Sequence, residues 1–128
     1  MPQYMLLIYG PSDRTPTQEE MAAEMPRWEA YTKGLQDAGV MRAGDALHGP
    51  DSATTVRVRD GETQITDGPF AETKETLGGY YLLECPDLDT ALKHAARMPN
   101  IAYGSVEVRP VVDFSAQPTA GEPASATA

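Results

Sequence analysis

The stretch that decides the fold is Tyr4-Met5-Leu6-Leu7-Ile8-Tyr9, an unbroken apolar run that a Gly-Pro pair at residues 10–11 ends. A short apolar run with such a boundary is typical of a β-strand that is buried on both faces. Side chains alternate along a strand, so Leu6 points to one face of the sheet and Leu7 to the other. The run therefore predicts a central strand.

A helix is predicted after this strand, between Thr17 and Gly39. Thr17 and Glu20 have the spacing of a capping box, and Gly39 stands where a left-handed C-terminal cap belongs. Pro26 interrupts the pattern, so either the helix kinks there or a short turn precedes a helix that starts near Pro26. We favour the kink because one apolar stripe continues across it, formed by Met21, Met25, Trp28, Tyr31 and Leu35.

The remaining elements are predicted in the order strand, hairpin, strand, helix, strand. Asp60-Gly61 is a strong hairpin signal, Asp87 can cap the second helix, and Pro99 stops it. Without the hairpin the order is βαββαβ, the pattern of a ferredoxin-like α+β fold. The predicted strands cover residues 40–47, 53–59, 62–66, 78–85 and 105–111.

Two helices can cover only one face of such a sheet. The central strands carry apolar side chains on both faces, and an uncovered second face would be a larger apolar patch than monomers usually expose. A two-fold dimer that packs two sheets face to face removes this patch. We therefore expect a homodimer.

Composition limits the partners of the chain. Among 128 residues, 10 are basic and 19 are acidic, which gives a net charge of −9. The chain has no basic cluster, and Arg57 and Arg59 fit a solvated strand face, so nucleic-acid binding is not expected. The single cysteine, Cys85, excludes an internal disulfide and is expected to be a buried thiol in a reducing compartment.

The sequence predicts one folded domain, residues 1–113. Residues 114–128 are almost all Ala, Pro, Ser, Thr and Gly, with too few apolar side chains to order the segment, so a disordered tail is expected. The N-terminus lacks the features of a signal peptide, and no stretch approaches the roughly 20 apolar residues of a membrane span. We expect a cytoplasmic protein without membrane contact.

The segment Asp67-Gly68-Pro69-Phe70-Ala71-Glu72-Thr73-Lys74-Glu75 combines a rigid turn, an aromatic ring and several charges. It resembles the DGPF-motif branch of the YCII-related family. The resemblance also includes residues 4–9, 53–57, 77–81 and 104–110, and it covers essentially residues 3 to 113. It implies a ferredoxin-like, dimeric α+β barrel.

The resemblance implies less about function than about fold. Some YCII-related proteins are suspected enzymes because they carry a His-Asp pair in a cleft, whereas this chain has only His48 and His94 and neither matches that pair. DGPF-type proteins are frequent genomic companions of extracytoplasmic-function sigma factors, which implies a regulatory role.

The 67–75 turn is the predicted ligand site. Asp67 either caps the turn by accepting backbone amides or acts as a base or ligand anchor at a cleft. Phe70 is either a core plug or an aromatic wall for a ligand. Glu72 and Lys74 are either solvated or paired with each other, or Glu72 points inward and pairs with Arg57 or Lys74 at a pocket.

Tyr9 and Tyr80 are expected to line the same pocket. Asp67 and His48 are the weak catalytic candidates, His48 because a loop imidazole can carry protons near neutral pH. His94 is expected to have a structural role near the C-terminal end of the second predicted helix. No metal-ligand spacing is present, and neither a metal nor a cofactor is expected.

Two functions remain open. The first is a small-molecule binding protein or enzyme with a cleft beside the Asp67–Phe70 turn. The second is a regulatory protein that contacts a sigma factor through its acidic surface.

Overall fold

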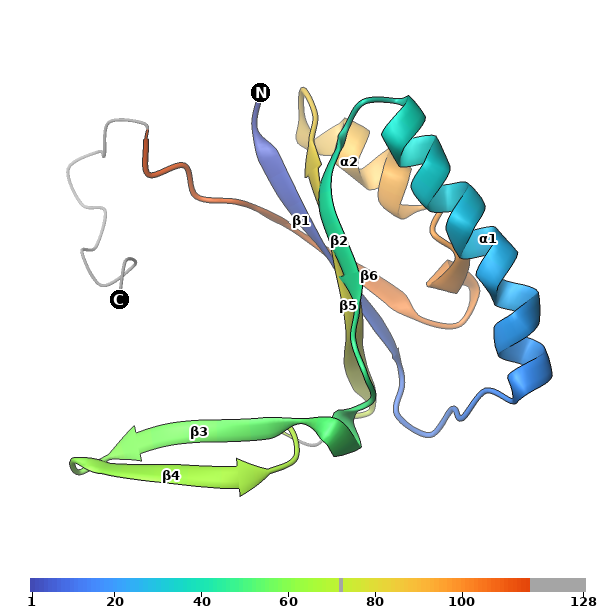
Figure 1. The fold of residues 1–128 in the computed structure, drawn as a ribbon. Helices are drawn as coiled ribbons and strands as arrows, with labels where there is room; N and C mark the ends of the chain where they lie inside the picture. The colour runs from blue at the N-terminus through green and yellow to red at the C-terminus, as the bar shows by residue number, and fades with distance from the viewer. Residues whose placement is uncertain (72, 116–128) are drawn as a thin grey trace.

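Two helices pack on one face of a four-stranded antiparallel sheet, and a separate hairpin projects from one end (Figure 1). The computed structural model describes residues 1–71 and 73–115. The strand order β2-β5-β1-β6 is that of a ferredoxin-like fold, so the predicted α+β class is confirmed. The elements are β1 (Gln3–Pro11), α1 (Gln18–Asp37), β2 (Met41–Ala46), η1 (Pro50–Ser52), β3 (Thr54–Arg59), β4 (Glu62–Asp67), β5 (Glu75–Glu84), α2 (Leu88–Ala95), η2 (Pro99–Ala102) and β6 (Ser105–Pro110).

The predicted central strand is β1, which lies between β5 and β6. Leu7 pairs with Tyr80 on one side and with Glu107 on the other. The β1–β5 register shifts at Ile8/Tyr9, which leaves Gly78 without a paired residue. A Cβ on Gly79 would lie 2.8 Å from the carbonyl oxygen of Asp45. The glycine pair thus permits both a bulge and a close backbone approach.

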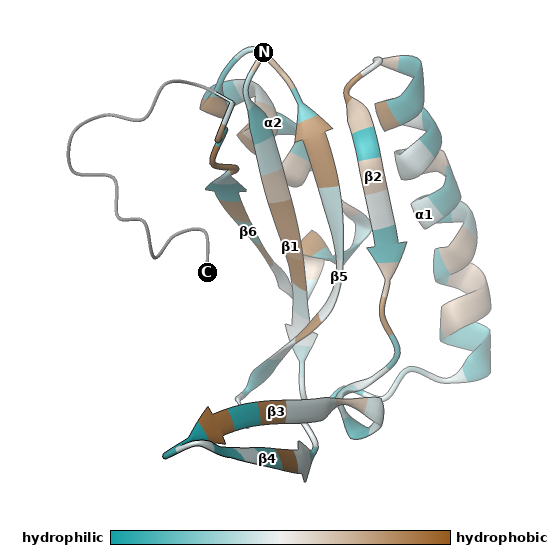
Figure 2. Ribbon diagram, turned by 60° about the vertical axis from the view of Figure 1, so that its left-hand side comes forward, coloured by the Kyte–Doolittle hydropathy of each residue, from teal (hydrophilic) through white to brown (hydrophobic). Residues whose placement is uncertain are grey.

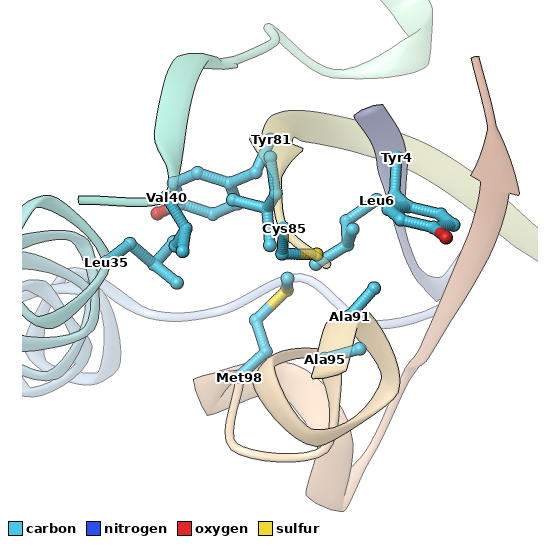
Figure 3. Packing of buried hydrophobic residues seen from close by; sticks show 10 residues of the cluster. Tyr4, Leu6, Leu35, Val40, Tyr81, Cys85, Ala91, Ala95 and Met98 are labelled. Carbon is cyan, nitrogen blue, oxygen red and sulfur yellow. The ribbon is translucent and has the colours of Figure 1, made fainter. Parts of the chain in front are cut away.

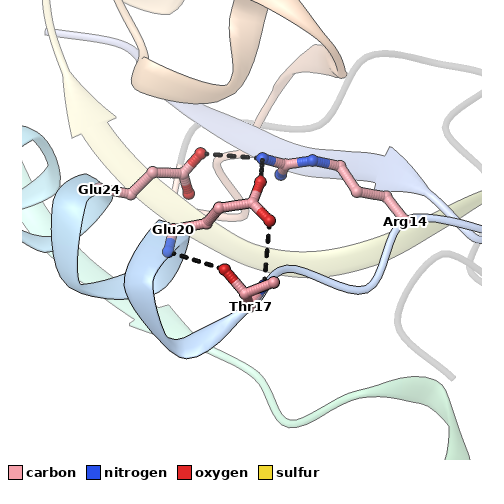
Figure 4. Close-up of polar contacts among 4 residues, drawn as sticks. All are labelled: Arg14, Thr17, Glu20 and Glu24. Atoms are coloured by element: carbon pink, nitrogen blue, oxygen red, sulfur yellow. Dashed lines mark hydrogen bonds and ion pairs between the residues drawn. The ribbon is translucent and has the colours of Figure 1, made fainter.

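The capping box of α1 forms as the sequence predicts (Figure 4). The Glu20 amide donates to Thr17 Oγ1 at 3.1 Å, and the Thr17 amide donates to Glu20 Oε1 at 3.2 Å. The helix continues through Pro26, so the alternative of a helix that starts near this proline is wrong. At the other end Gly39 has φ +73°, and the Val40 amide donates to Leu35 O at 3.2 Å, which closes the helix.

Arg14 fastens the loop that joins β1 to α1. Its guanidinium lies 3.3 Å from Glu24 Oε1 and 3.8 Å from Glu20 Oε2 (Figure 4). It also stacks 3.6 Å from the ring centroid of Tyr103. These contacts tie the start of α1 to the segment before β6.

The core lies between the helices and the sheet (Figure 3). Leu6, Leu35 and Leu83 are fully buried, and the predicted buried thiol, Cys85, is fully buried with them. The ring of Tyr81 packs against Gly44, and its hydroxyl shares a 2.7 Å hydrogen bond with Thr32. The buried set is Tyr4, Leu6, Leu35, Val40, Tyr81, Leu83, Cys85, Ala91, Ala95 and Met98.

The predicted helix stripes are only partly buried. Met21 and Met25 are exposed, because the first turns of α1 extend past α2, which lies beside the other half of α1 (Figures 1 and 2). On α2 the buried positions are Ala91 and Ala95, while Leu92 is 45% exposed. Asp87 caps α2 as predicted, by accepting the Thr90 amide at 2.8 Å.

The other face of the sheet carries no helix (Figures 1 and 2). Met5 and Leu7 alternate with buried Leu6, so they lie on this bare face, where β5 contributes Leu82. These three side chains are half-buried. Ion pairs Arg42–Glu84 and Arg109–Glu107 flank them, at 2.7 and 3.0 Å. Met5, Leu7 and Leu82 therefore form an apolar strip that is smaller than the patch that the sequence predicts.

The hairpin β3–β4 turns at Asp60-Gly61, with φ values of +52° and +78°. Positive φ at both positions matches the predicted two-residue turn. Among the described strands the hairpin pairs with no other, and it projects from the sheet on the side away from the helices (Figure 1). It exposes Val56, Val58 and Ile65 by 61%, 58% and 70%.

The boundary predicted at residue 113 is not tested by the fold. Phe114 is exposed, and residues 116–128 of the predicted tail lie outside the described residues. No helix in the described part of the chain is both long and apolar enough to cross a membrane.

Candidate functional site

A pocket of about 520 Å³ lies where the C-terminal end of β1 meets the starts of β5 and β6. The three strands are neighbours in the sheet, which brings segments distant in sequence to one place. Most of the residues around the pocket are polar or charged. They are Tyr9, Thr73, Lys74, Glu75, Ser105, Val106 and Glu107.

Tyr9 is a hydrogen-bond donor in this pocket. Its hydroxyl donates to Glu107 Oε1 at 3.3 Å. Burial, and then the Glu107 carboxylate, raises the pKa of Tyr9, so the phenol stays protonated at neutral pH. Arg109 donates to Glu107 Oε2 through two nitrogens, at 3.1 and 3.0 Å, and balances its charge.

Lys74 and Glu75 enter the pocket from the start of β5. The Ser12 amide donates to Lys74 O at 2.7 Å, and Ser105 Oγ donates to Glu75 Oε1 at 3.1 Å. Within residues 1–71 and 73–115, the Lys74 ammonium makes no ion pair.

The turn before Lys74 is held by β3. Gly68 has φ +101°, a conformation that a side chain would strain. Its amide donates to Ala53 O at 2.7 Å, and its carbonyl accepts from Thr55 Oγ1 at 2.8 Å. The Arg57 guanidinium donates to Phe70 O at 3.1 Å. The backbone of the Asp67–Phe70 turn is thus fixed on the hairpin side.

Comparison with known proteins identifies the family of the chain. The YCII-related domain matches residues 2–115. The chain belongs to the YCII-related family. A protein of Rhizobium meliloti (strain 1021), described as uncharacterized, is 38% identical over 112 residues, which is 84% of this chain and 90% of the relative. The family part of the resemblance is confirmed, and the DGPF branch is compatible with it.

The YCII-related chain brings two of the six predicted ligand residues, Tyr9 and Lys74, to the pocket. Tyr80 lies on the bare face of the sheet and donates to Asp45 Oδ2 at 2.6 Å. Phe70 is 79% exposed, so its interpretation as a core plug is wrong for the single chain. Glu72 lies outside the described residues.

The weak catalytic candidates lie apart from the pocket lining. Asp67 is exposed at the end of β4, and no amide donates to its carboxylate within the described residues. His48 is exposed in the loop after β2. His94 accepts a 2.8 Å hydrogen bond from Arg97 at the end of α2, which agrees with its expected structural role.

Sequence reasoning missed Ser105 and Glu107, which lie on β6. In the sequence, the alternation of Glu107 with Val106 and Val108 predicts only a half-buried or edge strand. The ferredoxin-like order contains a stronger signal, because it places the last strand beside the first. That neighbourhood puts residues 105–107 next to Tyr9.

Proposed function

We propose that this YCII-related protein binds a small polar molecule in the pocket beside the 67–75 turn. The observation that carries this proposal is that Tyr9, Glu75 and Glu107, from three neighbouring strands, line one pocket together with Lys74, which directly precedes β5. The pocket volume of about 520 Å³ falls within the range of small-molecule sites, about 300–1,000 Å³.

The polar groups define the chemistry of the ligand. Lys74 offers a positive charge to a carboxylate or another anionic group, while Glu75 accepts hydrogen bonds from hydroxyl or amino groups. Arg109 already balances Glu107. The pocket therefore suits a molecule that carries both an acidic group and a hydrogen-bond donor.

The test begins with a thermal-shift screen of polar metabolites, because a ligand at one hundred times its Kd adds about 2.7 kcal/mol of stability. For a ligand found in this way, we expect Lys74→Gln and Glu75→Gln each to raise Kd by about tenfold, since a hydrogen bond to a charged group contributes about 1.5–3 kcal/mol. Calorimetry measures both values. Asp67→Asn and Phe70→Ala show whether the site extends onto the turn.

Lys93→Gln, on the outer side of α2, is the matched control and should leave Kd unchanged. Wild-type affinity in both pocket variants would contradict the assignment of this site.

We also propose that two chains assemble through their bare sheet faces. The half-buried strip of Met5, Leu7 and Leu82 supports this assembly. So does the hairpin, since a two-stranded hairpin without packing is marginally stable in water, and this one exposes three apolar side chains. A second copy on this side would cover the strip and contact the projecting hairpin.

Leu82→Lys is expected to convert the dimer to a monomer, because it places a charge in the centre of the buried seam. Leu92→Lys, on the exposed side of α2, should remain dimeric. Sedimentation equilibrium at micromolar concentration measures both. A monomeric wild-type protein would refute the dimer.

A regulatory role with an extracytoplasmic-function sigma factor is the second candidate. The exposed Phe70 and the apolar side chains of the hairpin favour a protein contact there. Binding of a purified sigma factor, lost on Phe70→Ala and Ile65→Ser, would support this candidate. Equal binding by these variants would exclude the hairpin as the contact.

A further inference from the structure

A second pocket, of about 430 Å³, lies on the helical side of the molecule, far in sequence from the β-strand pocket. It opens between α1 and the segment that joins α2 to η2. None of its residues belongs to the small-molecule site described above. The lining residues are Arg27, Ala30, Tyr31, Gly34, Arg97 and Pro99.

The charged residues that line this pocket are both basic. They are Arg27 and Arg97, and no carboxylate of the described residues is part of the lining. This is unusual in a chain with 19 acidic and 10 basic residues. Both arginines are exposed, so an anion can reach them from solvent and gain charge-assisted hydrogen bonds.

Three other arginines form ion pairs with glutamates, whereas Arg57 and Arg59 donate to backbone carbonyls. Arg14, Arg42 and Arg109 each form an ion pair with at least one glutamate. In contrast, Arg27 makes no ion pair or hydrogen bond to any residue in the described ranges 1–71 and 73–115. The pocket is therefore lined by an exposed arginine that has no ion-pair partner among the described residues.

Arg97 is oriented by a neutral group. Its guanidinium lies 2.8 Å from His94 Nδ1, which accepts only if the imidazole is neutral. Burial, and then Arg97, lowers the pKa of His94, so the imidazole is neutral at pH 7. Tyr31 donates to His94 O at 2.6 Å and fixes the backbone there. Arg97 is thus positioned without losing its charge.

Small residues keep the pocket open. Ala30 and Gly34 are one helical turn apart on α1, and both line the pocket. A Cβ placed on Gly34 would meet no heavy atom within 4 Å. The space above this part of the helix is therefore free to hold a ligand.

We propose that this pocket binds a phosphoryl group through Arg27 and Arg97. Guanidinium groups match the oxygens of phosphate by paired, charge-assisted hydrogen bonds. The volume of about 430 Å³ accommodates a small phosphorylated metabolite. The site is independent of the proposed ligand pocket on the sheet.

Calorimetric titration with pyrophosphate at low ionic strength tests the proposal. We expect saturable binding by the wild type, and at least a tenfold rise in Kd for each of Arg27→Gln and Arg97→Gln. Ala30→Met keeps both charges but fills the pocket, and it should weaken binding to a similar extent. Arg59→Gln removes an exposed guanidinium from the hairpin and should leave Kd within twofold of wild type.

Three results would overturn the proposal. The first is no saturable binding of pyrophosphate by the wild type. The second is wild-type affinity in the Arg27→Gln/Arg97→Gln double variant. The third is an equal loss in Arg59→Gln, which would indicate attraction to surface charge alone. Lys74→Gln separates the two pockets, because loss of binding in that variant alone would place the phosphoryl site on the sheet.

Discussion

Gly104→Ala is expected to lower the free energy of unfolding by about 3 kcal/mol or more, the upper range for overpacked sites. A Cβ at this position would lie 2.3 Å from the carbonyl oxygen of Tyr9 and 3.2 Å from Asn100 Nδ2. Neither group can easily move. Tyr9 belongs to the central strand, and Asn100 is buried and donates to Tyr9 O at 3.2 Å.

The loss is measurable by urea denaturation followed by circular dichroism. It is a large part of the 5–15 kcal/mol that stabilises a typical domain. Gly10→Ala is the matched control, because a Cβ there meets no heavy atom within 4 Å. Equal stability of the two variants would show that β6 does not approach β1 as closely as described.

Leu6→Ala is expected to cost about 2–5 kcal/mol, the range for a leucine deleted from a packed core. Leu6 is fully buried on the central strand and belongs to the cluster between the sheet and the helices (Figure 3). Its removal takes away apolar contacts and leaves a cavity that rigid neighbours on the same sheet cannot fill.

The same denaturation experiment measures this loss. Leu92→Ala provides the comparison, since Leu92 is 45% exposed on α2 and should cost about 1 kcal/mol or less. If Leu6→Ala were no more costly than Leu92→Ala, the even-numbered face of β1 would not be the core face.

Local signals in the sequence predicted much of the fold. The capping box at Thr17, the cap at Gly39 and the Asp60-Gly61 turn depend on neighbouring residues, and all three form as predicted. The exposure of Met21 and Met25 could not be predicted in this way, because periodicity identifies one side of a helix but not how far its partner extends.

In the candidate site, too, local features could be predicted from the sequence and features that depend on packing could not. Tyr9 and Lys74 were within reach of sequence reasoning, since one ends the apolar strand and the other follows the rigid turn. The outward position of Phe70 could not be predicted from the sequence, because the burial of an aromatic ring in a turn depends on the surface that the turn packs against. Arg27 and Arg97 are 70 positions apart, and only the packing of α1 against the segment after α2 brings them to one pocket.

The separation of the hairpin from the sheet has a consequence for how this chain can diverge. Within the described residues β3 and β4 form a sheet of their own, and apart from Thr55 and Arg57, which hold the 67–70 turn, their side chains are free of the packing that shapes the central strands. Substitutions in the hairpin would change its exposed surface without disturbing the packing of the four-stranded sheet. We therefore expect substitutions on the exposed face of the hairpin to be tolerated more readily than substitutions in the packed core.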